Sequence, residues 1–162
     1  MIILGIDPGL TQTGFGLINV NSNTPVLIDY GVIKPPGIDV PLADRLKVVY
    51  TDIIEIINKY KSAVLVVEDI FYSKNVKSTI MLSHARAAAL LAGSSSNIPV
   101  YEYSARKVKQ SIAGNGNAQK EQLQYMVKAI LKLSDLPQPL DASDALAIAI
   151  CHYQQSTLIR EK

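Results

Sequence analysis

The chain has 162 residues, a formal net charge of +2, 48% hydrophobic residues and 19% charged residues. This length fits one folded domain, expected over residues 1–162, and the composition excludes a disordered chain. The single cysteine, Cys151, excludes an internal disulfide, and no segment approaches the roughly 20 consecutive apolar residues that a membrane-spanning helix needs. Because the first residues also lack a secretory signal pattern, we expect a cytoplasmic protein.

The charge is distributed unevenly along the chain. Residues 73–120 hold seven basic residues and one acidic residue, Glu102, for a balance of +6, whereas the remainder has 9 basic and 13 acidic residues, for −4. A basic segment in an otherwise acidic chain suits a protein that neutralises phosphates on one face and gathers carboxylates on another. A solvated helix face is the alternative interpretation.

The first third of the chain predicts three adjacent strands followed by a helix and a fourth strand. Residues 2–6, 15–20 and 26–33 are strand-like runs separated by turn residues at hairpin spacing. Apolar residues recur at helical spacing from Leu42 to Ile57, and the apolar run 63–67 then predicts a buried strand that pairs in parallel.

The rest of the chain predicts a short strand over 100–103 and helices over 76–92, 105–112, 118–133 and 142–153. Asp141 is the predicted N-cap of the last helix. Strands that alternate with helices in this way predict a layered α/β domain.

Four acidic residues are candidates for a metal site. Asp7 and Glu68 each stand at the carboxyl end of a predicted strand, so a parallel pairing would place them side by side. Asp141 and Asp144 are three residues apart at a helix start and share one face. Turn formation by Asp-Pro-Gly and compensation of the helix dipole are the ordinary alternatives. The nearly all-apolar helix after Asp141 argues against the second alternative, because a buried helix buries its acids with it.

Carboxylate ligands without a cysteine or histidine cluster suit Mg²⁺ or Mn²⁺ better than zinc. Two such ions about 3.5 to 4 Å apart would form the two-metal arrangement used for phosphodiester hydrolysis.

Four sequence blocks together resemble those of the RuvC family, in the same order and spacing. They are GIDPGLTQTGFG (5–16), VVEDIFYSKN (66–75), PVYEYSARKVKQSIAGNGNAQKEQ (99–122) and LDASDALAIAICH (140–152). The resemblance implies an RNase H-like fold with a mixed central sheet and helices on both faces. It also implies a homodimer that cuts four-way (Holliday) DNA junctions by paired nicks in recombination and repair.

The resemblance assigns roles to individual residues. It implies that the catalytic acids, which hold one or two Mg²⁺ ions with Mn²⁺ able to substitute, are Asp7, Glu68, Asp141 and Asp144. Phe71 matches an aromatic residue that stacks on an unpaired base. The remaining residues expected to contact DNA are Tyr72, Lys74, Lys77, Arg106, Lys107, Lys109 and Lys120. Whether a branch-migration complex of the RuvA/RuvB type is a partner stays open.

Some residues have no assigned role in the family pattern. Strand alternation predicts that Asp69 points away from the site, and His84 and His152 are interpreted as packing or interface residues. The predicted helix 76–92 is expected to form or border the dimer interface through its small residues, although packing on its own sheet would give the same pattern. These residues are Ala85, Ala88, Ala89 and Ala92.

Three other functions share some of these sequence features. An ATP-binding protein of the actin or sugar-kinase type also starts with a strand and an Asp-x-Gly turn, but it needs two such halves. A nuclease of the same fold could process structured RNA, for which the basic segment and the Phe71 loop fit less well. A non-catalytic junction-binding protein would not need to keep all four acids.

Overall fold

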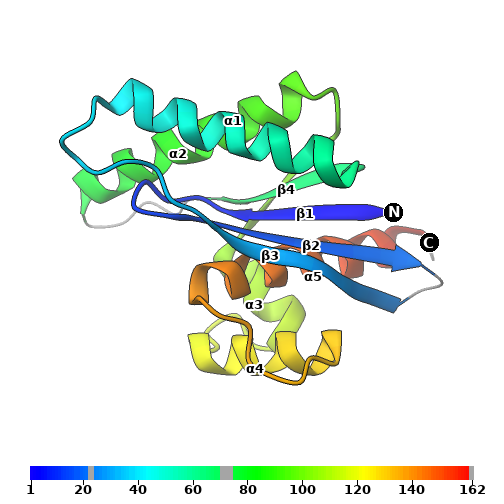
Figure 1. Cartoon of the computed structure of the whole chain (residues 1–162). Helices are drawn as coiled ribbons and strands as arrows, with labels where there is room; N and C mark the ends of the chain where they lie inside the picture. The colour runs from blue at the N-terminus through cyan, green and yellow to red at the C-terminus, as the bar shows by residue number, and fades with distance from the viewer. Residues whose placement is uncertain (22–23, 70–74, 161–162) are drawn as a thin grey trace.

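The structure is a computed structural model that describes residues 1–21, 24–69 and 75–160, with side chains described up to residue 157. A five-stranded sheet of order β3-β2-β1-β4-β5 lies at its centre (Figure 1). Strands β1 (Ile2–Asp7), β2 (Thr13–Asn21) and β3 (Thr24–Ile33) are antiparallel neighbours. Strands β4 (Val64–Asp69) and β5 (Val100–Ser104) continue the sheet in parallel with β1. The three adjacent strands and the parallel fourth strand are therefore confirmed.

Helices cover both faces of this sheet, as predicted (Figure 1). Helices α1 (Leu42–Tyr60) and α2 (Val76–Ser95) lie on one face. Helices α3 (Ala105–Ala113), α4 (Lys120–Leu131) and α5 (Leu140–Arg160) lie on the other. Among the described residues, no helix is both long and apolar enough to cross a bilayer.

Strand alternation divides the apolar side chains between two cores. Ile3 of β1 packs into the core beneath α5, whereas Leu4 and Ile6 pack into the core beneath α1 and α2. The same alternation in β4 sends Val66 toward α5 and Val67 toward α1 and α2. Every second residue of both strands therefore faces α5, and Asp7 and Glu68 continue these two rows.

One expectation drawn from the sequence is wrong in detail. Helix α5 begins at Leu140, two residues earlier than predicted, because the Pro139 carbonyl accepts the first helical hydrogen bonds from the backbone N–H groups of Ala142 and Ser143. Asp141 therefore lies in the first turn and is not the N-cap, which leaves its carboxylate free for other contacts. In α2, Ala85, Ala89 and Ala92 are fully buried within the chain, so the small size of these three residues serves internal packing. That the helix forms or borders a dimer interface stays a prediction.

Helix α5 crosses the sheet at very short range because glycines lie beneath it. A Cβ atom at Gly5 would lie 2.1 Å from the carbonyl oxygen of Ala145, and one at Gly14 would lie 2.0 Å from that of Asp141. Real Cβ atoms do not approach backbone atoms so closely, so α5 can hold this position only above glycine. The first turn of α5 is thereby held against the end of β1.

We expect Gly14→Ala to push the first turn of α5 away from the sheet. Overpacking of this kind costs about 1–3 kcal/mol of unfolding free energy, which denaturant titration measures. Gly37→Ala is the matched control, since its added Cβ would meet only the side-chain end of Asp39. Equal stability of the two variants would show that the close approach is not a constraint.

Candidate active site

The ends of β1 and β4 bring two acidic side chains together. Ile6 of β1 pairs with Val67 of β4 in the parallel register, so Asp7 and Glu68 are the next residues along each strand. Both lie in the rows that face α5, close enough for each carboxyl to shift the pKa of the other. The predicted side-by-side placement of these two acids is correct.

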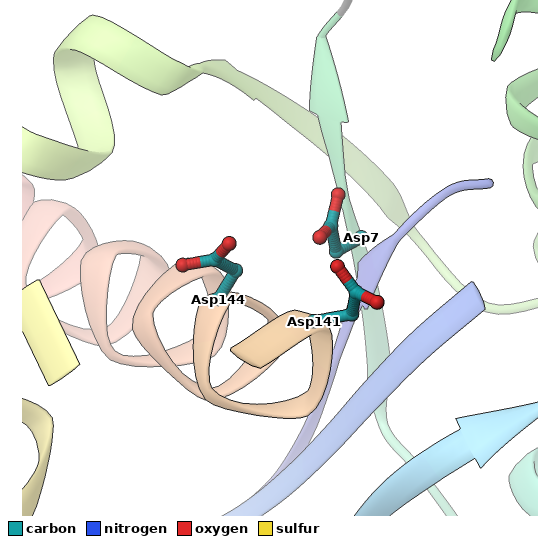
Figure 2. Close-up of side chains that lie close together, drawn as sticks. All are labelled: Asp7, Asp141 and Asp144. Atoms are coloured by element: carbon teal, nitrogen blue, oxygen red, sulfur yellow. The ribbon is translucent and has the colours of Figure 1, made fainter. Parts of the chain in front are cut away.

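The first turn of α5 adds two more carboxylates. One oxygen atom from each of Asp7, Asp141 and Asp144 lies within 4.8 Å of the others. Figure 2 shows the carboxylates of Asp7 and Asp141 close together, with that of Asp144 beside them, on the next turn of the same helix as Asp141. Glu68 lines the same cavity, of about 260 Å³, as Asp7 and Asp144. The chain thus brings all four predicted acids to one place.

The electrostatics of this acid cluster favour a bound cation. Burial raises the pKa of Asp7 well above its usual range, and repulsion by Glu68 and Asp144 adds to the effect. Burial also raises the pKa of Glu68, against the opposing effect of the neighbouring Asp7 carboxyl. Clustered, partly buried carboxylates are costly unless protons or cations neutralise them. Ligand atoms that are all carboxylate oxygens suit a hard divalent cation.

Two lysines from other helices border the acid cluster. Lys109 of α3 and Lys120 of α4 line the cavity, and Lys120 Nζ lies 3.1 Å from Asp144 Oδ2. Burial lowers the pKa of Lys120, but the attraction and hydrogen bond of Asp144 outweigh this and the net change is upward. Both predicted basic residues therefore stand beside the acids, and Asp144 favours the charged form of Lys120.

The other predicted DNA contacts lie farther out or cannot be placed. Arg106 and Lys107 are exposed on the first turn of α3. Lys77 is exposed on α2 and lines a groove together with Leu10 and Thr11. Three predicted contacts lie outside the described residues: Phe71, Tyr72 and Lys74.

Asp69 has a role distinct from that of its neighbour Glu68. It faces α2, where its Oδ1 lies 3.2 Å from an Arg86 nitrogen atom, and Arg86 also pairs with Glu102 of β5. The expectation that Asp69 points away from the acids is confirmed. Arg86 belongs to the basic segment of the sequence, but its charge is used within the fold.

The two histidines lie away from the acid cluster. His152 of α5 is buried, stacks against Tyr101 with ring centroids 4.4 Å apart, and its Nδ1 lies 3.0 Å from the hydroxyl of Tyr103. This confirms His152 as a packing residue. His84 is half-buried on α2 and lines an apolar groove beside Leu46 and Tyr50 of α1.

Sequence reasoning missed one polar residue at the acids. Gln12, in the turn between β1 and β2, donates a hydrogen bond from Nε2 to Asp141 Oδ2. The only signal in the sequence is its place in the turn that follows Asp7, and neither spacing nor composition links it to a residue 129 positions later.

A mixed sheet with acids at the ends of two parallel strands and at the start of a helix laid across them has the architecture of an RNase H-like nuclease. Residues 3–152 match the family described as crossover junction endodeoxyribonuclease RuvC. The chain belongs to this RuvC family, and its activity is that of a crossover junction endodeoxyribonuclease.

Relatives and solved structures agree with this assignment. The crossover junction endodeoxyribonuclease RuvC of Halothermothrix orenii is 47% identical over 99% of this chain and 97% of its own length. That of Desulforamulus reducens is 46% identical over 97% of this chain and 96% of its own. The RuvC structure of Thermus thermophilus, 30% identical, superposes with a TM-score of 0.87 over 98% of this chain and 96% of its own.

A second Thermus thermophilus structure, of RuvC in complex with a Holliday junction substrate, has a TM-score of 0.88 at 29% identity. It covers 98% of this chain and 96% of its own. These matches confirm the predicted RNase H-like fold. The alternative of an RNA-processing nuclease finds no support, because the matched family and the solved complex concern DNA junctions.

We expect Asp7→Asn to be more stable than the wild-type protein in EDTA at pH 8. A carboxyl whose pKa is raised by folding stabilises the folded state below its unfolded pKa of about 4, and this contribution is lost as pH rises through the folded pKa. The unfolding midpoint of the variant should be higher at pH 8 by about 2–4 °C for each kcal/mol relieved. The difference should vanish near pH 4, and a variant that is less stable at pH 8 would contradict the electrostatic account.

Proposed function

We propose that the chain resolves four-way (Holliday) junctions by Mg²⁺-dependent phosphodiester hydrolysis, with Asp7, Glu68, Asp141 and Asp144 holding the metal. The observation that carries the proposal is the convergence of these acids from three distant parts of the chain: Asp7, Asp141 and Asp144 cluster together, and Asp7, Glu68 and Asp144 line one cavity. The Thermus thermophilus complex with a Holliday junction substrate supports the choice of DNA. We also propose that residues 1–162 form a single RNase H-like domain.

Carboxylate oxygens alone favour Mg²⁺, with Mn²⁺ as a substitute, at one or two ions per site. When bound, such ions supply a nucleophile at neutral pH and offset the charge of the leaving oxygen. The chain's own residues would bind the metal ions and orient the DNA phosphate. The acids are preset by their attachment to two strand ends and a helix, and Lys109 and Lys120 balance phosphate charge at the cavity.

The direct test of this proposal replaces each acid by its amide. Asp7→Asn, Glu68→Gln, Asp141→Asn and Asp144→Asn should each abolish cleavage and leave junction binding largely intact, because each keeps the side chain's shape and removes a charge that holds metal. Single-turnover cutting of a synthetic four-way junction measures the first effect, and gel-shift titration in Ca²⁺ measures the second. Near wild-type cutting by any variant would remove that residue from the set of required ligands.

We also propose that DNA is contacted by Phe71, Tyr72, Lys74, Lys77, Arg106, Lys107, Lys109 and Lys120. Lysine and arginine would bind phosphates and give affinity that falls steeply with salt, without sequence preference. A base unstacked at the crossover and held on the ring of Phe71 would let the scissile phosphate reach the acids.

The stacking role predicts that Phe71→Ala slows cleavage about 10-fold to 100-fold, since stacking is typically worth about 1–3 kcal/mol per base. Phe71→Leu should lose most of the same rate, because it retains bulk without an aromatic face. Lys109→Ala and Lys120→Ala should instead flatten the salt dependence of binding. Single-turnover rates settle the matter: unchanged cutting by Phe71→Ala would rule out the stacking role.

Paired nicking further requires two active sites, and we propose a homodimer in which α1 and α2 form the interface. An almost wholly apolar groove of about 390 Å³ runs between these helices, lined by Leu46, Tyr50, Ala87, Ala88 and Leu91 among others. Leu91 lines this groove and is 59% exposed, so it offers apolar surface that a second copy could cover. A two-fold axis here would present two sites to opposite strands.

Leu91→Lys should therefore yield a monomer, which sedimentation at micromolar concentration would reveal. On a four-way junction that monomer should leave unpaired nicks. Val26→Lys is a matched control, since Val26 is 56% exposed on the edge strand β3, away from the groove. A wild-type chain that sediments as a monomer would remove the basis for paired nicking.

A further inference from the structure

Two acids of α5 receive a hydrogen bond from another part of the chain. Lys120 of α4 donates to Asp144, and Gln12 of the turn between β1 and β2 donates to Asp141. We propose that Gln12 is a positioning residue, which orients the Asp141 carboxylate as a metal ligand. This inference rests on the proposed function, because it assumes that Asp141 holds metal.

The turn that carries Gln12 is fixed near both of its ends. Thr13, which is fully buried, donates from Oγ1 to the Gly9 carbonyl oxygen at 2.7 Å and accepts from the Gly9 backbone N–H at 3.2 Å. These two bonds close the segment from Gly9 to Thr13 into a compact turn. The backbone on which Gln12 stands is therefore held next to the end of β1.

A buried arginine anchors the same turn from the other side of the sheet. Arg45 of α1 is 5% exposed, and its guanidinium donates to the Leu10 carbonyl oxygen at 2.8 Å and to the Pro36 carbonyl oxygen at 3.0 Å. Hydrogen bonds from a buried charged donor are strong and costly to break. Arg45 thus holds the turn against α1. Because the turn is held in place, the hydrogen bond from Gln12 can fix the orientation of the Asp141 carboxylate.

The chemistry of an amide suits a positioning role. The Gln12 Nε2 group donates to Oδ2 of Asp141 and does not engage Oδ1. The hydrogen bond restricts rotation of the carboxylate while Oδ1 can face a metal ion. The amide is neutral, and it therefore does not compete with a cation for the negative charge. Hydrogen bonds to metal ligands from such partners typically change metal affinity or activity about 10-fold to 100-fold when removed.

Gln12 also lines a groove beside the acids with Thr11, Lys120 and Asp141. A direct contact between Gln12 and DNA is therefore the competing role. The two roles differ in what the loss of the amide changes: metal affinity without DNA in the first case, and junction binding in the second.

The test compares Gln12→Met, which keeps the length of the side chain and removes the N–H donor, with Gln122→Met, an exposed position on α4. Calorimetric titration of the DNA-free chain with MnCl₂ should show about 10-fold to 100-fold weaker affinity in Gln12→Met only. The Mg²⁺ concentration for half-maximal cutting should shift equally, whereas junction binding should not change. Unfolding midpoints in EDTA, and a second variant Gln12→Leu, verify that the fold is kept.

A double-mutant cycle assigns the effect to Asp141. If Gln12 acts through Asp141, then Gln12→Met should cause no further loss of Mn²⁺ affinity in the Asp141→Asn background. Unchanged Mn²⁺ affinity in Gln12→Met, or additive losses in the double variant, would overturn the inference. Weakened junction binding with normal Mn²⁺ affinity would likewise overturn it in favour of DNA contact.

The same measurements separate this inference from the proposed function. If the wild-type chain cuts junctions in EDTA, or if Asp141→Asn cuts normally, the metal-holding role of Asp141 fails regardless of Gln12. If wild type requires metal and Asp141→Asn is inactive, then a wild-type titration curve for Gln12→Met defeats the positioning role alone.

Discussion

The site depends on one packing constraint: the backbone of α5 must lie directly on β1 and β2. Gly5 and Gly14 make this possible, because any side chain there would collide with carbonyl oxygens of the helix. The contact places the first turn of α5 at the carboxyl end of β1, within reach of Asp7. Without it, the two acids of α5 and the two acids of the sheet would be separate pairs on different elements.

That packing brings like charges together, and the surrounding residues reduce the resulting repulsion only in part. Lys120 pairs with Asp144 and Gln12 donates to Asp141, yet burial and mutual repulsion still raise the pKa of Asp7. The folded chain therefore carries an electrostatic cost that a divalent cation would relieve. The negative charge of this site is costly without a counterion, and its carboxylates are rigidly held. Such a site is well suited to bind metal in a fixed arrangement.

Local patterns in the sequence were sufficient to predict much of this architecture. Strand-end positions predicted that Asp7 and Glu68 would be neighbours, and three-residue spacing predicted that Asp141 and Asp144 would share a face. That the pair on the strands would meet the pair on the helix was predicted only from resemblance to a family. This meeting depends on α5, which lies more than 130 residues after β1 in the sequence. The contact between Gln12 and Asp141 had no local signature in the sequence. Ala85 and Ala89 pack inside the chain, and a pattern of small residues on a helix looks the same whether it packs internally or against a second copy.

The proposed role of the four acids is metal-dependent cleavage of branched DNA. The most direct measurement incubates the chain with a synthetic four-way junction or a linear duplex of matched sequence, in Mg²⁺ or in EDTA, and resolves the products on a denaturing gel. Symmetric cuts near the crossover are expected in the junction with Mg²⁺, and no cuts are expected in the other three reactions. Equal cutting of the linear duplex, or cutting of the junction in EDTA, would contradict it.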